Sequence, residues 1–191
     1  MSLITPTGFE KATTLTEPYT FKYLFDYNSN IDIHPIQKPL LPATTLTEKG
    51  YYCMFRSCYG LTKAPELPAM TMAKACYAKM FHNCTALVEA PYLPATTLAE
   101  SCYAAMFRGC TKLTKAPTLP AASLVRYCYE AMFYDCSSLN AVTCLATDIS
   151  ASGCVSAWLK NVASTGTFTK AASMTSWTTG ESGIPSGWTV Q

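Results

Sequence analysis

The sequence predicts an α/β solenoid made of repeats of about 26 residues, each with one helix and one strand, and with a cap at either end. Three observations predict this fold. A Leu-Pro pair returns every 26 residues, an apolar stripe with helical spacing follows it, and a short segment that ends in Ala-Pro closes the unit. Self-similarity at such a period is typical of arrays in which each repeat buries its apolar face against the next.

The period holds without gaps over four copies. The Leu-Pro pairs begin at Leu41, Leu67, Leu93 and Leu119, and Leu145-Ala146 takes the next position without the proline. Tyrosine, Met-Phe and two cysteine series share the period. The cysteine series are Cys58, Cys84, Cys110 and Cys136, and Cys76, Cys102, Cys128 and Cys154. Positions that are held in every copy meet the same environment in every copy, which indicates a shared core.

A helix is expected in each repeat because Leu98, Cys102, Met106 and Cys110 follow one another at intervals of four residues. The segment Thr97-Leu98-Ala99-Glu100 has the form of a capping box. The position that ends the helix holds residues that tolerate the left-handed conformation or are small, namely Ser57, Asn83, Gly109 and Asp135. The L-x-x-A-P that follows is typical of a brief strand.

These features divide the chain into three parts. Residues 1–40 are expected to form an N-terminal cap from a degenerate repeat, and residues 163–191 a C-terminal cap that could be a β-ribbon, with Trp177 and Trp188 closing the core. The repeats lie between them at 41–66, 67–92, 93–118 and 119–144, with an imperfect fifth at 145–162. TGTFTKA within the C-terminal part alternates like a strand.

The composition excludes several partners. Charged residues make up 14% of the chain, the formal net charge is +2, and no two basic residues are adjacent, so we expect no nucleic-acid binding. No apolar stretch approaches the roughly 20 residues that span a bilayer. No signal peptide is visible at the N-terminus, which fits either a cytosolic chain or one whose leader is not part of the sequence.

The ten cysteines lack the C-x2-C pairs that are typical of zinc sites. Buried, reduced thiols are the favoured interpretation of both cysteine series, with some disulfides as the alternative and a metal site as the weakest one. We therefore expect no metal and no cofactor. Cys53 and Cys144 lie outside the two series and are the ones expected to be reactive or paired.

Catalytic residues do not stand out. His34 and His82 are the two histidines, and His82 shares its position in the repeat with Arg56, Arg108 and Tyr134, which suggests a helix residue facing solvent. A nucleophilic pair of Cys84 with a histidine is conceivable, but a cysteine in a core series is poorly placed for it. The sequence predicts that the protein is not an enzyme.

Positions that vary between copies are the better candidates for binding. On the predicted strand they form short columns. The candidate binding residues are Lys63, Glu66, Glu89, Tyr92, Lys115 and Thr118. The alternation of Lys63, Glu89 and Lys115 fits a stabilising ladder as well as a binding patch.

The order of these residues resembles the BspA-type leucine-rich repeats over roughly residues 41–162. Met106-Phe107 matches the aromatic pair of that family, Gly109-Cys110 its Gly-Cys, Leu113 and Ala116 its strand, and Leu119-Pro120 its Ile-Pro. The period of 26 residues, the Ala-Pro strand and the second cysteine series depart from the family pattern.

The resemblance implies a leucine-rich-repeat solenoid and a cell-surface or secreted bacterial protein without catalysis. The expected function is then adhesion, through recognition of a protein or glycan by the strand face. A structural or spacer role, in which the array presents other domains or forms part of a surface appendage or virion, is the alternative.

Overall fold

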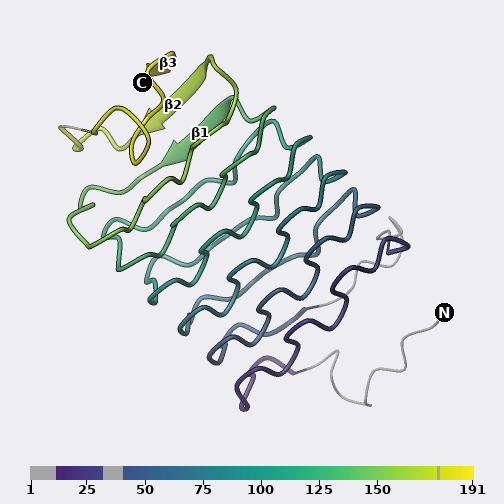
Figure 1. Cartoon of the computed structure of the whole chain (residues 1–191). Coiled ribbons are helices and arrows are strands. Elements are labelled where there is room, and N and C mark those ends of the chain that lie inside the picture. The colour runs from purple at the N-terminus through teal and green to yellow at the C-terminus, as the bar shows by residue number, and fades with distance from the viewer. Residues whose placement is uncertain (1–11, 32–40, 176) are drawn as a thin grey trace.

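The computed structural model describes residues 12–31, 41–175 and 177–191. Successive segments of the chain form coils that lie side by side, from the N-terminal to the C-terminal end (Figure 1). The strands are β1 (Ala141–Cys144), β2 (Gly166–Lys170) and β3 (Trp188–Val190). They form one parallel sheet in the order β1-β2-β3, with Val142 opposite Phe168 and Phe168 opposite Val190.

The predicted fold class is wrong. The described residues contain no helix and only three short strands, so the chain is not a leucine-rich-repeat solenoid of helix-plus-strand units. Where the sequence predicts helices, the backbone forms runs of turns instead. The capping-box form is misleading for the same reason, and in the corresponding segment the Thr47 hydroxyl donates to the Glu17 carbonyl of the preceding coil.

A left-handed residue at every fourth position prevents the helix. In one coil Lys49, Cys53 and Ser57 have φ angles of 52°, 54° and 56°. L-residues adopt this conformation as single residues and not in right-handed helices. The equivalent residues of the other coils, all at positive φ, are Tyr19, Tyr23 and Tyr27; Ala75, Lys79 and Asn83; Ser101, Ala105 and Gly109; Tyr127, Ala131 and Asp135; and Gly153, Ala157 and Asn161.

The backbone hydrogen bonds of a turn run alternate between two partners. The Tyr52 N–H donates to the Lys49 carbonyl three residues earlier, at 3.1 Å, and closes a turn. The Tyr51 N–H donates to the Cys76 carbonyl of the next coil, at 2.9 Å. Every second amide thus holds its own coil and the others join neighbouring coils. We call this arrangement the turn sheet.

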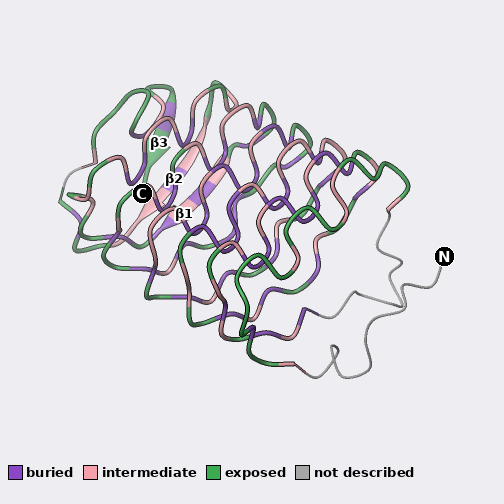
Figure 2. Cartoon of the chain, turned by 60° about the horizontal axis from the view of Figure 1, so that its bottom comes forward, coloured by how far each residue is buried: buried purple, intermediate pink, exposed green. Residues whose placement is uncertain are grey.

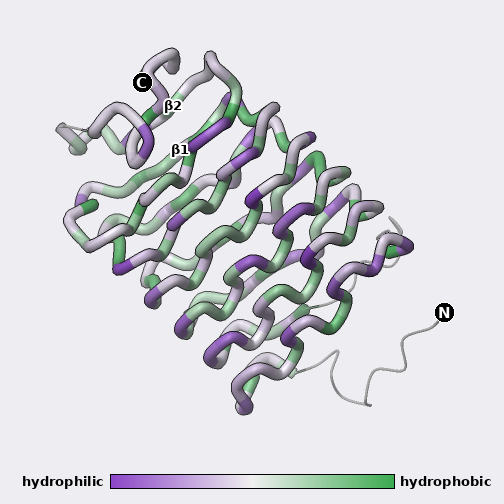
Figure 3. Tube along the Cα trace, viewed as in Figure 1, coloured by the Kyte–Doolittle hydropathy of each residue, from purple (hydrophilic) through white to green (hydrophobic). Residues whose placement is uncertain are grey.

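Columns of stacked aromatic rings fill the core between the turn sheet and the extended segments. Ring centroids of Tyr51 and Tyr77 lie 5.6 Å apart, and those of Phe55 and Phe81 lie 5.7 Å apart. All four side chains are almost fully buried. The buried stretches recur at the same place in successive coils, and so do the apolar ones (Figures 2 and 3). Because the rings meet across coils, each coil buries its apolar side chains only against its neighbours.

The extended segments lie in parallel on the other side of the core. Isolated bridges pair Lys63 with Glu89 and Lys115 with Ala141, and the latter leads into β1. Register then shifts by one residue, because Leu119 pairs with Cys144 and not with Leu145. Cys144 therefore occupies the buried position that leucine fills in the earlier coils, whereas Leu145 is exposed.

Residues 14–31 form the first coil of the turn sheet, and Phe25 stacks on Phe55 at 5.2 Å. The rest of the predicted N-terminal cap, residues 1–11 and 32–40, lies outside the described residues. At the other end, the predicted strand in TGTFTKA is confirmed as β2. β2 and β3 are parallel, so they do not form a hairpin ribbon. Trp177 stacks on Trp158 at 5.4 Å over the last coil.

Candidate functional site

The extended segments place the candidate binding residues on one surface, which we call the strand face. Lys63, Glu89 and Lys115 are exposed, and the bridge between Lys63 and Glu89 brings opposite charges next to each other. Glu66 and Thr118 are exposed as well. Tyr92 is 71% exposed, more than any other large apolar side chain among the described residues.

Two further apolar side chains are exposed in these extended segments. Val88 is 43% exposed and Met70 is 51% exposed. Val88 lies in the same segment as Tyr92, whereas Met70 lies next to Thr71, which pairs with Thr45 in a separate bridge. Exposed apolar groups that gather on one surface mark interaction sites more often than single ones do. The strand face therefore combines an aromatic side chain, the aliphatic side chain of Val88 and charges of both signs.

All ten cysteines are free and buried. Those of the first series share one contact, because each thiol donates to a phenylalanine carbonyl of the preceding coil. The pairs are Cys58–Phe25, Cys84–Phe55, Cys110–Phe81 and Cys136–Phe107, with sulfur–oxygen distances of 3.0 to 3.1 Å. Each of these carbonyls also accepts a turn N–H, so the thiol fills its second acceptor position.

Burial suppresses the reactivity of these thiols. It raises the pKa of Cys58 to about 11 and that of Cys136 to about 12. Since the thiolate is the nucleophile and metal ligand, neutral thiols are inert at pH 7. Cys53 and Cys144, which the sequence singles out as reactive or paired, are buried and free like the others, and burial raises the pKa of Cys144 to about 12.

Only one of the two histidines lies among the described residues. His34 lies outside the described residues. His82 lies in a turn run, and its Nδ1 atom is buried without a hydrogen-bond partner. Burial, and then the positive charges of Arg108, Lys79 and Arg56, lower the pKa of His82 to about 4. It is therefore neutral at pH 7, and the nearby Cys84 thiol donates to the Phe55 carbonyl.

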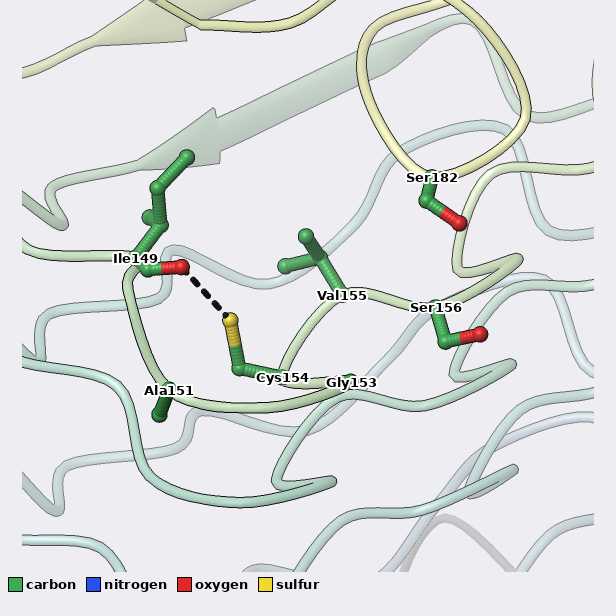
Figure 4. A pocket seen from close by; sticks show the side chains of 7 residues that line it. All are labelled: Ile149, Ala151, Gly153, Cys154, Val155, Ser156 and Ser182. Atoms are coloured by element: carbon green, nitrogen blue, oxygen red, sulfur yellow. Dashed lines mark hydrogen bonds between the residues drawn. The ribbon is translucent and has the colours of Figure 1, made fainter.

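An open hollow of about 280 Å³ lies at the C-terminal end of the turn sheet (Figure 4). Ile149, Gly153, Val155 and Ser182 are among its lining residues. Cys154 also lines it, but its thiol donates to the Ile149 carbonyl at 3.2 Å. Within residues 12–31, 41–175 and 177–191, no group of three or more His, Cys, Asp or Glu side chains is arranged to hold a metal ion.

The structure also shows a second candidate surface, on the outside of the turn sheet, which the sequence pattern does not reveal. Tyr19, Tyr23 and Tyr27 lie there at intervals of four residues, and the Lys22 ammonium lies over the first two rings. The period of four is visible in the sequence, but residues 1–40 break the 26-residue repeat. Tyrosines in a degenerate first repeat therefore read as core and not as surface.

No helix in the described part of the chain is long and apolar enough to cross a membrane. Comparison with known proteins gives no relative: no protein-family model, no curated protein and no solved structure matches this chain. The geometry of its two surfaces is therefore the basis for a functional proposal.

Proposed function

We propose that the chain is a non-catalytic recognition module that binds a protein or glycan through the strand face. The observation that carries this proposal is the exposure of Tyr92, at 71%, in a segment that also exposes Val88 and buries its leucines. Tyrosine is enriched among the residues that dominate binding energy at interfaces. Lys63, Glu89 and Lys115 lie in the same and the two neighbouring extended segments, and would add charges that help to select a partner.

The same proposal places the module in a bacterial surface or secreted protein that acts in adhesion. This part rests on the sequence resemblance and on no feature of the geometry. The proposal does not involve cysteine chemistry, because all ten cysteines are buried and none supplies an accessible thiolate.

A glycan array and a panel of purified cell-surface proteins, probed with the wild-type chain, test the proposal. Tyr92→Ala should weaken binding to any ligand found by tenfold or more, since a central aromatic anchor contributes about 2 kcal/mol or more. Tyr59→Ala is the matched control, because Tyr59 is also exposed (47%) but lies in the turn between a turn run and the next extended segment. Equal binding by wild type and Tyr92→Ala would refute the strand face as the recognition surface.

A structural or spacer role is the alternative, and the continuity of the array supports it. Stacked aromatic rings and backbone hydrogen bonds join each described coil to the next. The coils therefore form one continuous stiff body with its ends apart. This role predicts that no ligand is found on either panel. A ligand that Tyr92→Ala loses and Tyr59→Ala keeps would rule it out as the main function.

A further inference from the structure

The first coil carries three tyrosines that its backbone does not require. Tyr19, Tyr23 and Tyr27 have φ angles of 62°, 60° and 58°. The turn sheet demands positive φ at these positions, and most other coils meet the demand with Gly, Ala, Ser, Asn, Asp, Cys or Lys. A bulky side chain in the left-handed region costs roughly 1 kcal/mol or more relative to glycine.

The rings of these tyrosines are exposed and not used for core packing. Tyr19 is 45% exposed, Tyr23 is 42% exposed and Tyr27 is 63% exposed. A strained and exposed aromatic side chain gains nothing from the core. Strain of this kind, found where the fold does not need the residue, points to a role in binding.

Lysine ammonium groups gather around the same rings. The Lys22 Nζ lies 5.2 Å from the centroid of Tyr19, 5.0 Å from that of Tyr23 and 5.8 Å from that of Tyr52. Lys49 lies over Tyr19 at 5.4 Å. Cation–π attraction holds a charge near a ring without neutralising it.

A third lysine, Lys79, lies over Tyr52 at 6.0 Å. We call Tyr19, Tyr23, Tyr52, Lys22, Lys49 and Lys79 the aromatic–lysine patch. Its rings and ammonium groups come from three successive coils, so the turn sheet fixes their spacing.

Among the described residues, one of the three lysines of the patch has an ion-pair partner. Neither Lys22 nor Lys79 makes an ion pair with any residue of the described ranges. Lys49 has Glu48 at 3.7 Å. Asp26 is bound to Arg56 by two hydrogen bonds, from Nε at 2.8 Å and from Nη2 at 2.5 Å, and is therefore not available to the lysines. Like charges gathered in this way repel one another, and a bound anion relieves that repulsion.

We propose that the aromatic–lysine patch binds an acidic polysaccharide. Tyrosine rings offer flat apolar faces to the apolar faces of sugar rings, and ammonium groups pair with the carboxylates that the sugars carry. The charge of the ligand must be sparse, because the patch holds three lysines and the whole chain has a net charge of +2. A nucleic acid, with a phosphate at every nucleotide, fits this charge density less well.

The patch lies on the turn sheet, and so this proposal goes beyond recognition by the strand face. It is tested by isothermal titration with polygalacturonic acid as the probe and neutral dextran as the uncharged comparison. Wild type should bind polygalacturonic acid, should bind it more weakly as salt is raised, and should not bind dextran. No heat of binding with polygalacturonic acid would overturn the proposal.

Variants assign the binding to the patch. Lys22→Gln with Lys79→Gln should weaken binding at least tenfold, and Tyr23→Asn should weaken it while keeping a residue that tolerates positive φ. Lys112→Gln removes one exposed charge far along the chain and should bind like wild type. Circular dichroism and a urea midpoint show whether each variant folds.

Two outcomes would refute the assignment. One is wild-type affinity in the Lys22/Lys79 double variant. The other is equal or tighter binding of oligo(dT) or poly-L-glutamate that is lost in the same variants, which would identify a different polyanion as the partner. Tyr92→Ala should bind polygalacturonic acid like wild type, so failure of the strand-face proposal and failure of this one are distinguished.

Discussion

An Ala→Gly substitution in the turn sheet tests whether the segment is a turn run or a helix, because the free energy of unfolding should rise in the first case and fall in the second. Ala131 has a φ angle of 48°, lies in the segment where the sequence predicts a helix, and is half-buried. In a helix, Ala→Gly destabilises by about 1 kcal/mol. At positive φ, glycine instead removes the conformational strain of alanine, which is about 1–2 kcal/mol. Part of this gain is lost, because glycine makes the unfolded chain more flexible.

We therefore expect Ala131→Gly to raise the free energy of unfolding by about 0.5–1 kcal/mol. The matched control is Ala104→Gly in the preceding coil. Ala104 is also half-buried and lies in a predicted helix, but its φ is not positive. The free energy of unfolding of this variant should fall by about 0.5–1 kcal/mol, because Ala104 has no strain at positive φ for glycine to remove.

Urea denaturation at equilibrium, followed by tryptophan fluorescence, measures both changes. With slopes held equal, the midpoints of the two variants should move in opposite directions from wild type. Thermal midpoints should diverge as well, by roughly 2–4 °C per kcal/mol for a chain of this size. Destabilisation of both variants by the same amount would refute the turn sheet and restore the helix.

Three further predictions concern buried polar groups. In native buffer a thiol reagent should find almost no reactive cysteine and in denaturant all ten, because all are buried and free; several fast-reacting thiols in the native protein would contradict this. The pKa of His82 falls from 6.5 to about 4 on folding, so stability is complete above pH 6.5 and decreases as the pH falls toward 4. After allowance for solvent screening the loss is on the order of 1–2 kcal/mol, and urea midpoints of His82→Gln should lack it; an unchanged pH profile in this variant would show that other groups cause the decrease. The Tyr51 hydroxyl is buried without a partner, so Tyr51→Phe should stabilise the fold by about 1 kcal/mol, and a lower urea midpoint would reveal a bond that the hydroxyl makes.

Much of the core could be predicted from the sequence. The 26-residue period places tyrosine, phenylalanine, cysteine and leucine at equivalent positions, and these side chains do stack across coils. Asn83, Gly109 and Asp135 were expected to tolerate the left-handed conformation at the end of a helix; they do have positive φ, as does Ser57, but no helix precedes them. Period alone reports which side chains share an environment, so it identifies the core without identifying the backbone.

The helix was wrong because spacing of four residues has two explanations. A helix repeats every 3.6 residues, and over three turns this is hard to distinguish from a turn run that repeats every four. The discriminating residues are Ala105 and Ala131, which have positive φ although alanine is the strongest helix former. Tertiary hydrogen bonds between coils override that propensity, and they cannot be read from one repeat.

The register shift at β1 was hidden for a different reason. Leu145-Ala146 continues the period in the sequence, so Cys144 reads as lying outside the core series. The chain instead pairs Cys144 with Leu119 and exposes Leu145. Burial of a cysteine and a leucine is similar in free energy, and sequence spacing does not decide between them.

The alternating hydrogen bonds give the turn sheet two chemically different edges. At the first coil the carbonyls of Lys22, Leu24 and Asp26 accept no hydrogen bond from any described residue, whereas their equivalents in later coils accept one. At the last coil the free groups are N–H donors, and Ser182 Oγ accepts from one of them, Ala157. The array thus has a direction, because its first edge presents carbonyl acceptors and its last edge presents N–H donors. Two copies brought together by their first coils would set acceptor against acceptor, so these edges cannot pair through main-chain hydrogen bonds.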